Sequence, residues 1–495
     1  MKKERRWFHN TVYALLPLML FGVDYLNLLA FPIGLHQHES VRELVVFGII
    51  GVATLLMLAK VFLLWKEDPS NRKPILGVGI ILVLFTATHL AAMIIRPDKA
   101  YILKRMLLNG CYLALACCGS LVIYLEQEIQ KFLKYCKIYA IVALPVILFY
   151  CIRLYVSDIE YAENLGVLPY MQIAYLLLAI CTALLAEKYL LPMEPHTWGM
   201  KWNLPLYLMY VVAITLSGTK GAIICAIICS VLVCIYAIWQ TNAGKRILLL
   251  PIITVLIIGA FTTALYPHNG SDSRFVAMLK EQLGMNDFTI EHDELQEKLE
   301  GVAPVHPTQV TTAGQPPSST HPQEEQADTN LRKPSEIIAY YETGQASADF
   351  QCGKITAEEY DTIEILYRNL VWTPSGLRNY LWQSALREIK NSPVLGLGPY
   401  GFYGLYGMDP HNFFLETAVD FGLPILILIL CLGVYTFVKL ISLSFRQEYV
   451  AVFLLYVLTF LFQRMVSGSL YDYMTFFQYG ICAILMLAFR KDKAK

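Results

Sequence analysis

Charged residues are scarce in this sequence, and neither sign is in excess. Lysine and arginine total 39, aspartate and glutamate also total 39, and charged residues make up only 16% of the chain. Because the chain has no overall basic footprint, we exclude nucleic acid as a partner. Hydrophobic residues reach 56%, a share typical of a multi-pass membrane protein and not of a soluble enzyme.

Patterns that bind metals or form disulfides are also missing. Most of the 12 cysteines fall in apolar runs, where cysteine serves as a small packing residue. Cys352 has no evident loop partner, so we predict neither a disulfide framework nor a CxxC metal site. No His, Asp or Glu cluster has ligand spacing, and we predict no metal. The first apolar run lacks a small-residue cleavage site and is expected to remain as a membrane anchor.

Long apolar segments recur along the chain. Since a helix needs about 20 apolar residues to cross a bilayer, we predict an all-α polytopic membrane protein with about 12 transmembrane helices. The boundary between the seventh and eighth is the least distinct, because only a short Gly-Thr-Lys stretch separates them. The predicted spans are 11–34, 44–65, 74–95, 106–125, 138–156, 166–186, 204–218, 221–240, 247–266, 411–438, 449–466 and 473–489.

Lysine and arginine gather at both ends of the chain and in every second connection between the predicted spans. Positively charged connections stay in the cytoplasm, so both termini are predicted to be cytoplasmic. The connection after the third span departs from this rule. It holds Arg96 and Arg105 on the predicted extracytoplasmic side. This departure fits a functional role for these charges and fits chance variation equally well.

The longest connection lies between the ninth and tenth spans. It covers 267–410 and separates spans one to nine, in 1–266, from spans ten to twelve, in 411–495. A loop of this length usually carries function. Its middle, about 301–333, is rich in Pro, Thr, Gln and Ser and is predicted to be disordered. Helical patterns flank this linker, so we predict a small helical extracytoplasmic cap.

The end of the insert carries a titratable residue at a predicted helix start. Asp409 as cap and Pro410 in the first turn are a helix-start signal. His411 then lies in the first turn of the tenth span, where the helix dipole favours neutral imidazole. Polar residues follow at helical spacing and form a stripe that must face protein or water. This stripe consists of Asn412, Glu416 and Asp420.

Several cations lie near the predicted outer ends of the spans, where they can form an anion pocket. Arginine suits phosphate because its fork bonds two oxygens, whereas lysine acts as a point charge. Lys220 follows a tight turn at a helix N-terminus, which adds backbone N–H groups. Arg153 and Arg464 are equally compatible with side chains that snorkel to the headgroups. The first candidates are Arg378 and Lys220, followed by Arg153 and Arg464, and then by Arg105 and Arg96.

Two segments, SGLRNYLWQSALREIKNSPVLGLGPYGFYG and DPHNFFLETAVDFGLPILILIL, resemble the signature of the O-antigen polymerase and O-antigen ligase superfamily. SGTKGAIICAIICS resembles an earlier family segment, with Lys220 where the family usually has arginine. The resemblance implies a metal-independent, cofactor-free membrane glycosyltransferase of the GT-C type. Its donor would be a polyprenyl-pyrophosphate-linked oligosaccharide, used on the extracytoplasmic side of the plasma membrane.

The resemblance also suggests roles for individual residues. His411 is the candidate general base for the acceptor hydroxyl, and Arg378 is the candidate that stabilises the leaving pyrophosphate. Trp382 lies one turn after Arg378 on the same helical face and fits either stacking on a sugar or core packing. His411 also fits a purely structural role. The expected substrate-binding residues are Lys220, Arg153, Arg464, Arg105, Asn412, Glu416 and Trp382.

We expect a polymerase that joins lipid-linked repeats into surface or capsular polysaccharide. The same motifs fit an O-antigen ligase or a protein O-oligosaccharyltransferase. A polysaccharide flippase would also explain the many spans, but it predicts inverted repeats, and no repeat is evident in the sequence. The expected partners are the lipid-linked donor and acceptor, the lipid bilayer, and flippase and chain-length regulator proteins.

Overall fold

The computed structural model forms two compact units, one of Met1–Ser273 with Ser375–Lys495 and the other of Arg274–Pro374. The predicted domain limits at 266 and 410 stay predictions. The predicted linker at about 301–333 lies almost wholly outside the described residues. The residues that the structure describes are 2–96, 99–156, 165, 168–191, 202–240, 245–264, 333–372, 376–444 and 448–466.

The described part of the chain is helical, apart from one isolated bridge between Leu165 and Leu168. In the first unit, the helices are α1 (Lys2–Leu15), α2 (Leu18–Ala30), α3 (Glu39–Glu67), α4 (Arg72–Ile95), α5 (Lys99–Glu126), α6 (Ile129–Val156), α7 (Tyr170–Tyr189), α8 (Asn203–Leu216), α9 (Lys220–Gln240), α10 (Leu249–Gly259), α16 (Gly376–Asn391), α17 (Gly401–Tyr406), α18 (Phe413–Phe421), α19 (Leu423–Ser444) and α20 (Glu448–Val466).

Seven of the described helices are long and apolar enough to cross a membrane. The number rises to eight if α1 and α2, which meet at 68°, form one bent span. Helices α8, α10 and α20 coincide with predicted spans but have shorter apolar stretches, and 473–489 lies outside the described residues. The structure is therefore that of a multi-pass membrane protein, while the predicted number of twelve spans and their orientation stay predictions.

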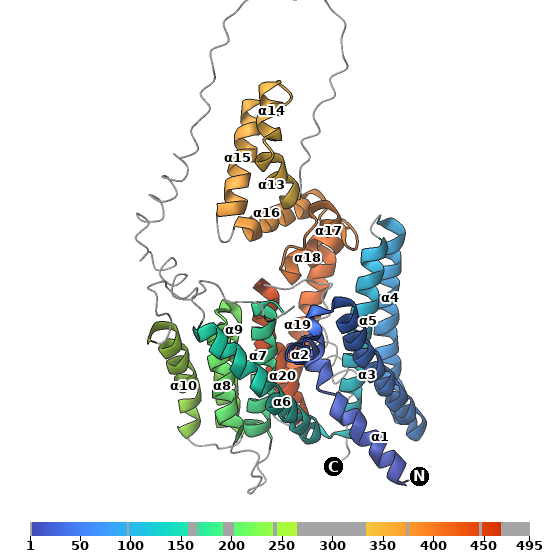
Figure 1. The fold of residues 1–495 in the computed structure, drawn as a ribbon. Helices are drawn as coiled ribbons and strands as arrows, with labels where there is room; N and C mark the ends of the chain where they lie inside the picture. The colour runs from blue at the N-terminus through green and yellow to red at the C-terminus, as the bar shows by residue number, and fades with distance from the viewer. Residues whose placement is uncertain are drawn as a thin grey trace, which may run out of the picture. The chain divides into compact units, whose positions relative to one another are not determined.

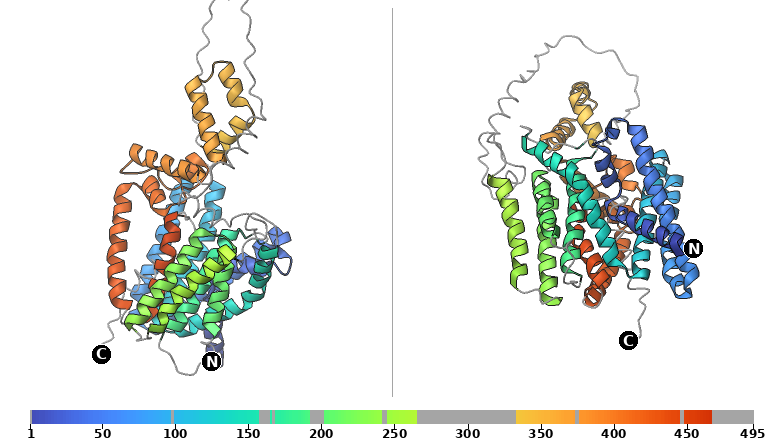
Figure 2. Two further views of the ribbon diagram at one scale, coloured as in Figure 1. Left: turned by 90° about the vertical axis from the view of Figure 1, so that its left-hand side faces the viewer. Right: turned by 60° about the horizontal axis from the view of Figure 1, so that its bottom comes forward.

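Helix α2 connects two groups of membrane helices. It packs against α3 and α5 on one side and against α6 and α7 on the other. Helices α3, α4 and α5 pack together, and α6 to α10 form the second group, with α20 against α7 and α9 (Figure 1). Two further views show the helices of this second group running side by side (Figure 2).

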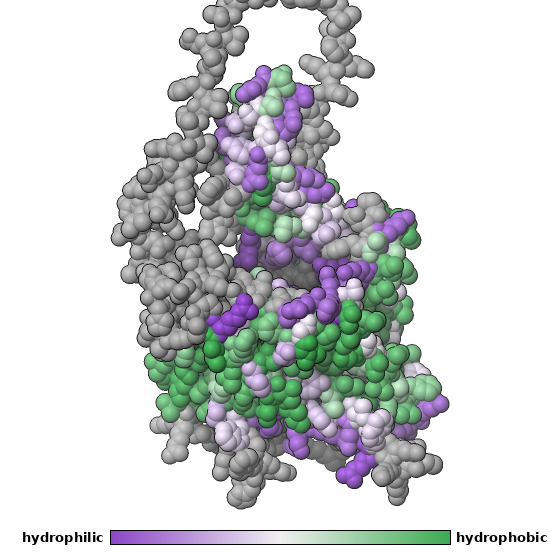
Figure 3. All heavy atoms as spheres, viewed as in Figure 1, coloured by the Kyte–Doolittle hydropathy of each residue, from purple (hydrophilic) through white to green (hydrophobic). Residues whose placement is uncertain are grey.

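An apolar band crosses the face of the bundle seen in Figure 3, with more polar residues above and below it. Long apolar side chains are exposed along α3, α4 and α19, for example Leu84 at 61% and Leu428 at 62%. Exposed apolar side chains on this scale are unfavourable in water and are expected where lipid covers them. The band thus marks the part of the bundle that lies in the membrane.

Charged residues inside the bundle are paired near the helix ends. Lys60 of α3 is buried and lies 2.5 Å from a carboxylate oxygen of Glu126 at the end of α5. Lys137 contacts Glu187 at 2.7 Å, and the Asn203 amide donates to the same carboxylate at 2.8 Å. Such pairs reduce the cost of removing charge from water, which explains why these residues are tolerated beside lipid.

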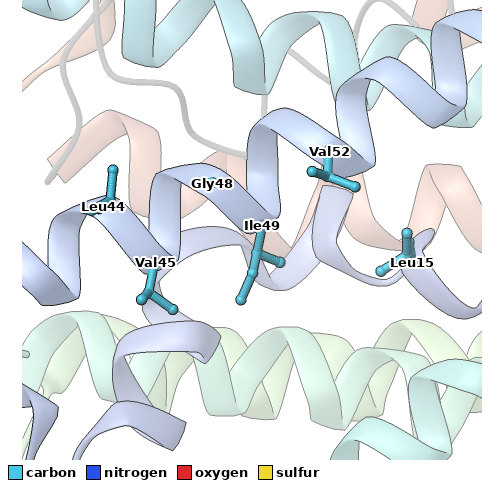
Figure 4. Close-up of a pocket in the computed structure, with 6 residues that line it drawn as sticks. All are labelled: Leu15, Leu44, Val45, Gly48, Ile49 and Val52. Atoms are coloured by element: carbon cyan, nitrogen blue, oxygen red, sulfur yellow. The ribbon is translucent and has the colours of Figure 1, made fainter.

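A shallow apolar groove lies beside α3. It is lined by Leu15, from the end of α1, and by Leu44, Val45, Gly48, Ile49 and Val52 of α3 (Figure 4). Its side chains carry no titratable group, so the groove offers nothing for acid–base chemistry.

The second unit contains three described helices, α13 (Pro334–Glu342), α14 (Gln345–Gln351) and α15 (Ala357–Trp372). The start of α15 is a capping box, in which Glu359 accepts from the Thr356 N–H at 2.7 Å and donates its own N–H to the Thr356 hydroxyl at 3.2 Å. Helices α13 and α15 match the predicted helical patterns on the C-terminal side of the linker.

The prediction of one continuous tenth span over 411–438 is wrong. The helix is interrupted at Gly422, whose φ of +84° cannot continue a helix. Helices α18 and α19 are therefore separate. The Leu423 N–H donates to the Pro393 carbonyl at 2.8 Å. A Cβ atom on Gly422 would lie 2.1 Å from the Val394 carbonyl oxygen. Close approach of two backbones therefore requires glycine here.

The glycine-rich loop, residues 396–400, lies against the C-terminal end of α18. Gly396 and Gly398 both have positive φ, and this turns successive amides toward the helix. The Leu397 N–H donates to Val419 O and the Gly398 N–H to Asp420 O, each at 2.8 Å. The last carbonyls of a helix have no intrahelical partner, so these bonds satisfy them.

We predict that Gly422→Ala destabilises the folded protein by more than about 2 kcal/mol, because an L-residue at positive φ costs about 1–2 kcal/mol before the clash with Val394 is added. The matched control is Gly404→Ala in α17, since no atom lies within 4 Å of a Cβ placed there. Thermal unfolding in detergent measures both variants. Equal unfolding midpoints for Gly422→Ala, Gly404→Ala and wild type would contradict the close backbone contact between Gly422 and Val394.

Candidate active site

The helix that follows the glycine-rich loop begins at Asn412. The Asn412 side chain accepts from the backbone N–H groups of Phe414 at 3.0 Å and Leu415 at 3.1 Å. This is an N-cap, typically worth about 1 kcal/mol. The predicted helix start at Asp409 and Pro410 is therefore wrong by three residues, because Asn412 takes the cap position. His411 lies just outside α18, not in its first turn.

His411 adopts a left-handed backbone conformation, with φ of +51°. This conformation costs a non-glycine residue about 1–2 kcal/mol. It persists only where the surroundings fix it, and such positions cluster at functional sites. The side chain is half-buried. His411 is thus held in an unfavourable conformation with its imidazole still partly accessible.

Helix α16 contributes one of the contacts that fix this conformation. The Trp382 indole N–H donates to the carbonyl of Pro410, directly before His411, at 2.8 Å. The Asn412 cap fixes the chain on the other side of the histidine. The structure thus gives the Trp382 N–H a positioning contact, and stacking of its ring on a sugar stays a prediction.

Arg378 lies on α16 one turn before Trp382 and is exposed. Residues four apart share a helix face, so Arg378 stands on the side of α16 from which Trp382 reaches Pro410. The predicted pairing of Arg378 and His411 in one site stays a prediction.

The two acidic residues of α18 are buried. Glu416 and Asp420 are each 1% exposed. An Asp420 carboxylate oxygen accepts the Phe402 N–H at 2.9 Å, so Asp420 holds α17 against α18. This favours polar packing for Asp420 over contact with acceptor hydroxyls. Binding of substrate by Asn412 and Glu416 stays a prediction.

A polar contact that the sequence did not suggest joins α16 to α17. The Tyr406 hydroxyl donates to Glu388 at 2.8 Å and accepts from the Arg387 guanidinium at 3.0 Å. Burial raises the pKa of the Tyr406 hydroxyl, so it stays protonated and can donate. A hydrophobic cluster that includes Leu381, Phe402 and Val419 fills the space between α16, α17 and α18. The three short helices therefore form one packed unit around the site (Figure 1).

Arg96, a candidate cation of the anion pocket, has a different role in the structure. Its guanidinium donates to backbone carbonyls of the glycine-rich loop, including Pro399 O at 3.2 Å. The unexpected positive charge after the third predicted span therefore supports the loop. Its partners lie about three hundred residues away, so local sequence pattern carries no signal for this contact.

The remaining candidate cations lie on four other helices. Lys220 is the first residue of α9 and is half-buried, Arg105 is half-buried near the start of α5, and Arg153 is exposed in the last turn of α6. Arg464 lies on α20, and its side chain is outside the described part of the structure. The predicted convergence of these cations on His411 stays a prediction.

The turn before Lys220 is tightly packed. Gly218 has φ of +65°, and the Ser217 hydroxyl bonds to Thr219 at 3.2 Å. A Cβ on Gly221 would lie 2.3 Å from the Tyr175 hydroxyl oxygen, which explains the glycine directly after Lys220. Lys220 is thus rigidly placed at a helix N-terminus, a position that suits an anion.

Comparison with known protein families gives one match. The family model described as O-antigen ligase matches residues 205–430, a stretch that contains Lys220, Arg378 and His411. No curated protein and no solved structure matches this chain. Residues 205–430 are therefore similar to the O-antigen ligase family, which confirms the resemblance of this membrane protein to the O-antigen polymerase and ligase superfamily.

Proposed function

We propose that this protein is a membrane glycosyltransferase that joins polyprenyl-pyrophosphate-linked oligosaccharide repeats into a surface polysaccharide. The observation that carries the proposal is His411, a strained and partly accessible histidine inside the family-matched region. Its neighbours on both sides are fixed by hydrogen bonds. Residues held in such conformations cluster at functional sites, which supports a chemical role for His411.

The reaction uses the acceptor hydroxyl as nucleophile. Its oxygen forms a bond to the anomeric carbon of the donor while the bond from that carbon to the pyrophosphate oxygen breaks. His411 accepts the hydroxyl proton, and such general-base help is worth about 10²–10⁴-fold in rate. The bonding electrons leave with the pyrophosphate, whose growing negative charge Arg378 and Lys220 stabilise. We propose that these protein groups act without a metal.

We place the reaction on the extracytoplasmic side of the plasma membrane. Helices α16, α17 and α18 lie at the end of the bundle opposite the N-terminus of α1 (Figure 1). The predicted cytoplasmic location of that N-terminus, from its basic residues, supports this placement.

An O-antigen ligase is the second candidate, and the description of the matching family favours it. It would use the same donor and the same proton transfer, and only the acceptor would differ. Lipid-linked repeats as acceptor give a polymer, whereas a lipid A core acceptor gives a single transfer. Supplying each acceptor to the purified protein distinguishes the two.

We predict that His411→Ala and Arg378→Ala each lower glycan transfer at least about 100-fold, since each removes a group that acts on the transition state. The assay is chain growth on a polyprenyl-pyrophosphate repeat unit in proteoliposomes. Matched controls are His38→Ala, an exposed histidine before α3, and Lys390→Ala, an exposed cation at the other end of α16. Normal polymer from both site variants would refute the mechanism.

Trp382→Phe is expected to lower turnover about fivefold with the KM for donor changed less than about threefold, because one hydrogen bond worth about 1 kcal/mol is lost. The phenyl ring keeps a stacking surface but cannot donate to Pro410. Steady-state kinetics of Trp382→Phe and Trp382→Ala check this. If Trp382→Ala alone is impaired, and its KM for donor is raised, then Trp382 acts by stacking on the sugar.

A further inference from the structure

One face of α4 is occupied by the glycine-rich loop. His89 and Ala92 lie three residues apart and share a face of α4, and Arg96 is the residue directly after the end of this helix. His89 and Ala92 are 2% and 0% exposed. Ala92 packs in a cluster with Tyr400, to which Phe421 of α18 also contributes. The membrane helix, the loop and the end of α18 thus meet at one place.

Arg96 binds three successive loop carbonyls. Its Nε–H donates to Pro399 O at 3.2 Å, and its Nη2 lies 2.5 Å from Leu397 O and 3.5 Å from Gly398 O. The guanidinium supplies several N–H donors in a fixed plane, which one ammonium group cannot do. A Cβ on Gly401 would lie 2.9 Å from the same Nη2 atom, so the loop is packed directly against the guanidinium.

His89 holds the next loop residue. Its Nδ1 is 2.9 Å from the Phe85 carbonyl, which can only accept, so Nδ1 carries the proton. Its Nε2 is 2.9 Å from the Tyr400 hydroxyl, which donates to it in the neutral tautomer. Tyr400 has φ of +56°, a conformation that is unfavourable for tyrosine. The bond to His89 helps to retain this conformation.

The other side of the same loop is bonded to α18. Backbone N–H groups of Leu397 and Gly398 donate to the last carbonyls of α18, and the Phe402 N–H donates to the Asp420 carboxylate. The loop is therefore bonded to α4 through its carbonyls and to α18 through its amides. Helix α18 spans nine residues, and its first end carries the Asn412 cap beside His411.

We propose that Arg96 and His89 are positioning residues for His411. Helix α4 fixes the glycine-rich loop, the loop fixes the C-terminal end of α18, and α18 fixes the backbone next to His411. Neither residue touches the reacting atoms in this arrangement. The inference rests on the proposed function for its effect on turnover, whereas its effect on the loop is independent of any activity.

Hydrogen–deuterium exchange of the full-length protein in nanodiscs tests the contact itself. In Arg96→Ala, amides in 396–402 should exchange at least about tenfold faster than in wild type, because the donors to three loop carbonyls are lost. Tyr400→Phe removes one hydroxyl and keeps the ring, so it tests His89 without a cavity. The matched control is Lys104→Ala, which removes an exposed charge near the start of α5. Unchanged exchange in Arg96→Ala and Tyr400→Phe would overturn the proposal.

Kinetics of the same variants test positioning. Turnover in Arg96→Ala and Tyr400→Phe should fall about tenfold with the KM for lipid-linked donor changed less than about threefold, because the donor contacts remain. Arg96→Lys should stay impaired, since it keeps the charge and loses the planar fork. Full turnover in Arg96→Lys would overturn the proposal. So would wild-type turnover in Arg96→Ala when His411→Ala is inactive.

The two proposals fail in different ways. If the wild-type protein transfers no glycan, the proposed function fails, and the exchange measurement still decides whether Arg96 and His89 hold the loop. If His411→Ala abolishes transfer and the loop variants leave both exchange and turnover unchanged, the proposed function stands and the positioning role fails.

Discussion

Backbone hydrogen bonds between the glycine-rich loop and the last turn of α18 are the contact on which the candidate site depends. Leu397 and Gly398 donate to Val419 and Asp420, and they reach these carbonyls only because glycines at 396, 398 and 422 adopt positive φ. The donors let α18 end inside the protein without unsatisfied carbonyls. His411 therefore stands before a short, protein-enclosed helix and not at the head of a membrane helix.

The break at Gly422 also separates two chemical environments. On one side, Glu416 and Asp420 are almost completely buried. On the other side, α19 exposes apolar residues such as Ile427 and Leu428 along the apolar band. A single straight helix would have placed both acidic residues on a lipid-spanning segment, where a charge is costly. Two helices joined by one glycine avoid this cost and leave the polar helix free to pack against α16 and α17.

Features encoded by local sequence were predicted well, and features that depend on distant contacts were not. Apolar length located the long apolar helices among the described residues. The start of α18 was misplaced because Asp409 and Asn412 are both good caps, and the contact that favours Asn412 includes Trp382, which lies on another helix. The roles of Arg96, His89 and Glu388 were missed for the same reason, since their partners are set by tertiary packing.

The distance along the chain between Arg96 and its partners has a consequence for biosynthesis. Arg96 precedes Leu397 by 301 residues, and ribosomes add about 5–20 residues per second. Arg96 is therefore made about 15–60 s before the loop whose carbonyls accept hydrogen bonds from its guanidinium group. During this interval Arg96 lacks the loop carbonyls that it binds in the complete protein. The membrane helices of the first half are thus made before the loop and α18 that they contact. The candidate site assembles only after most of the chain has been synthesised.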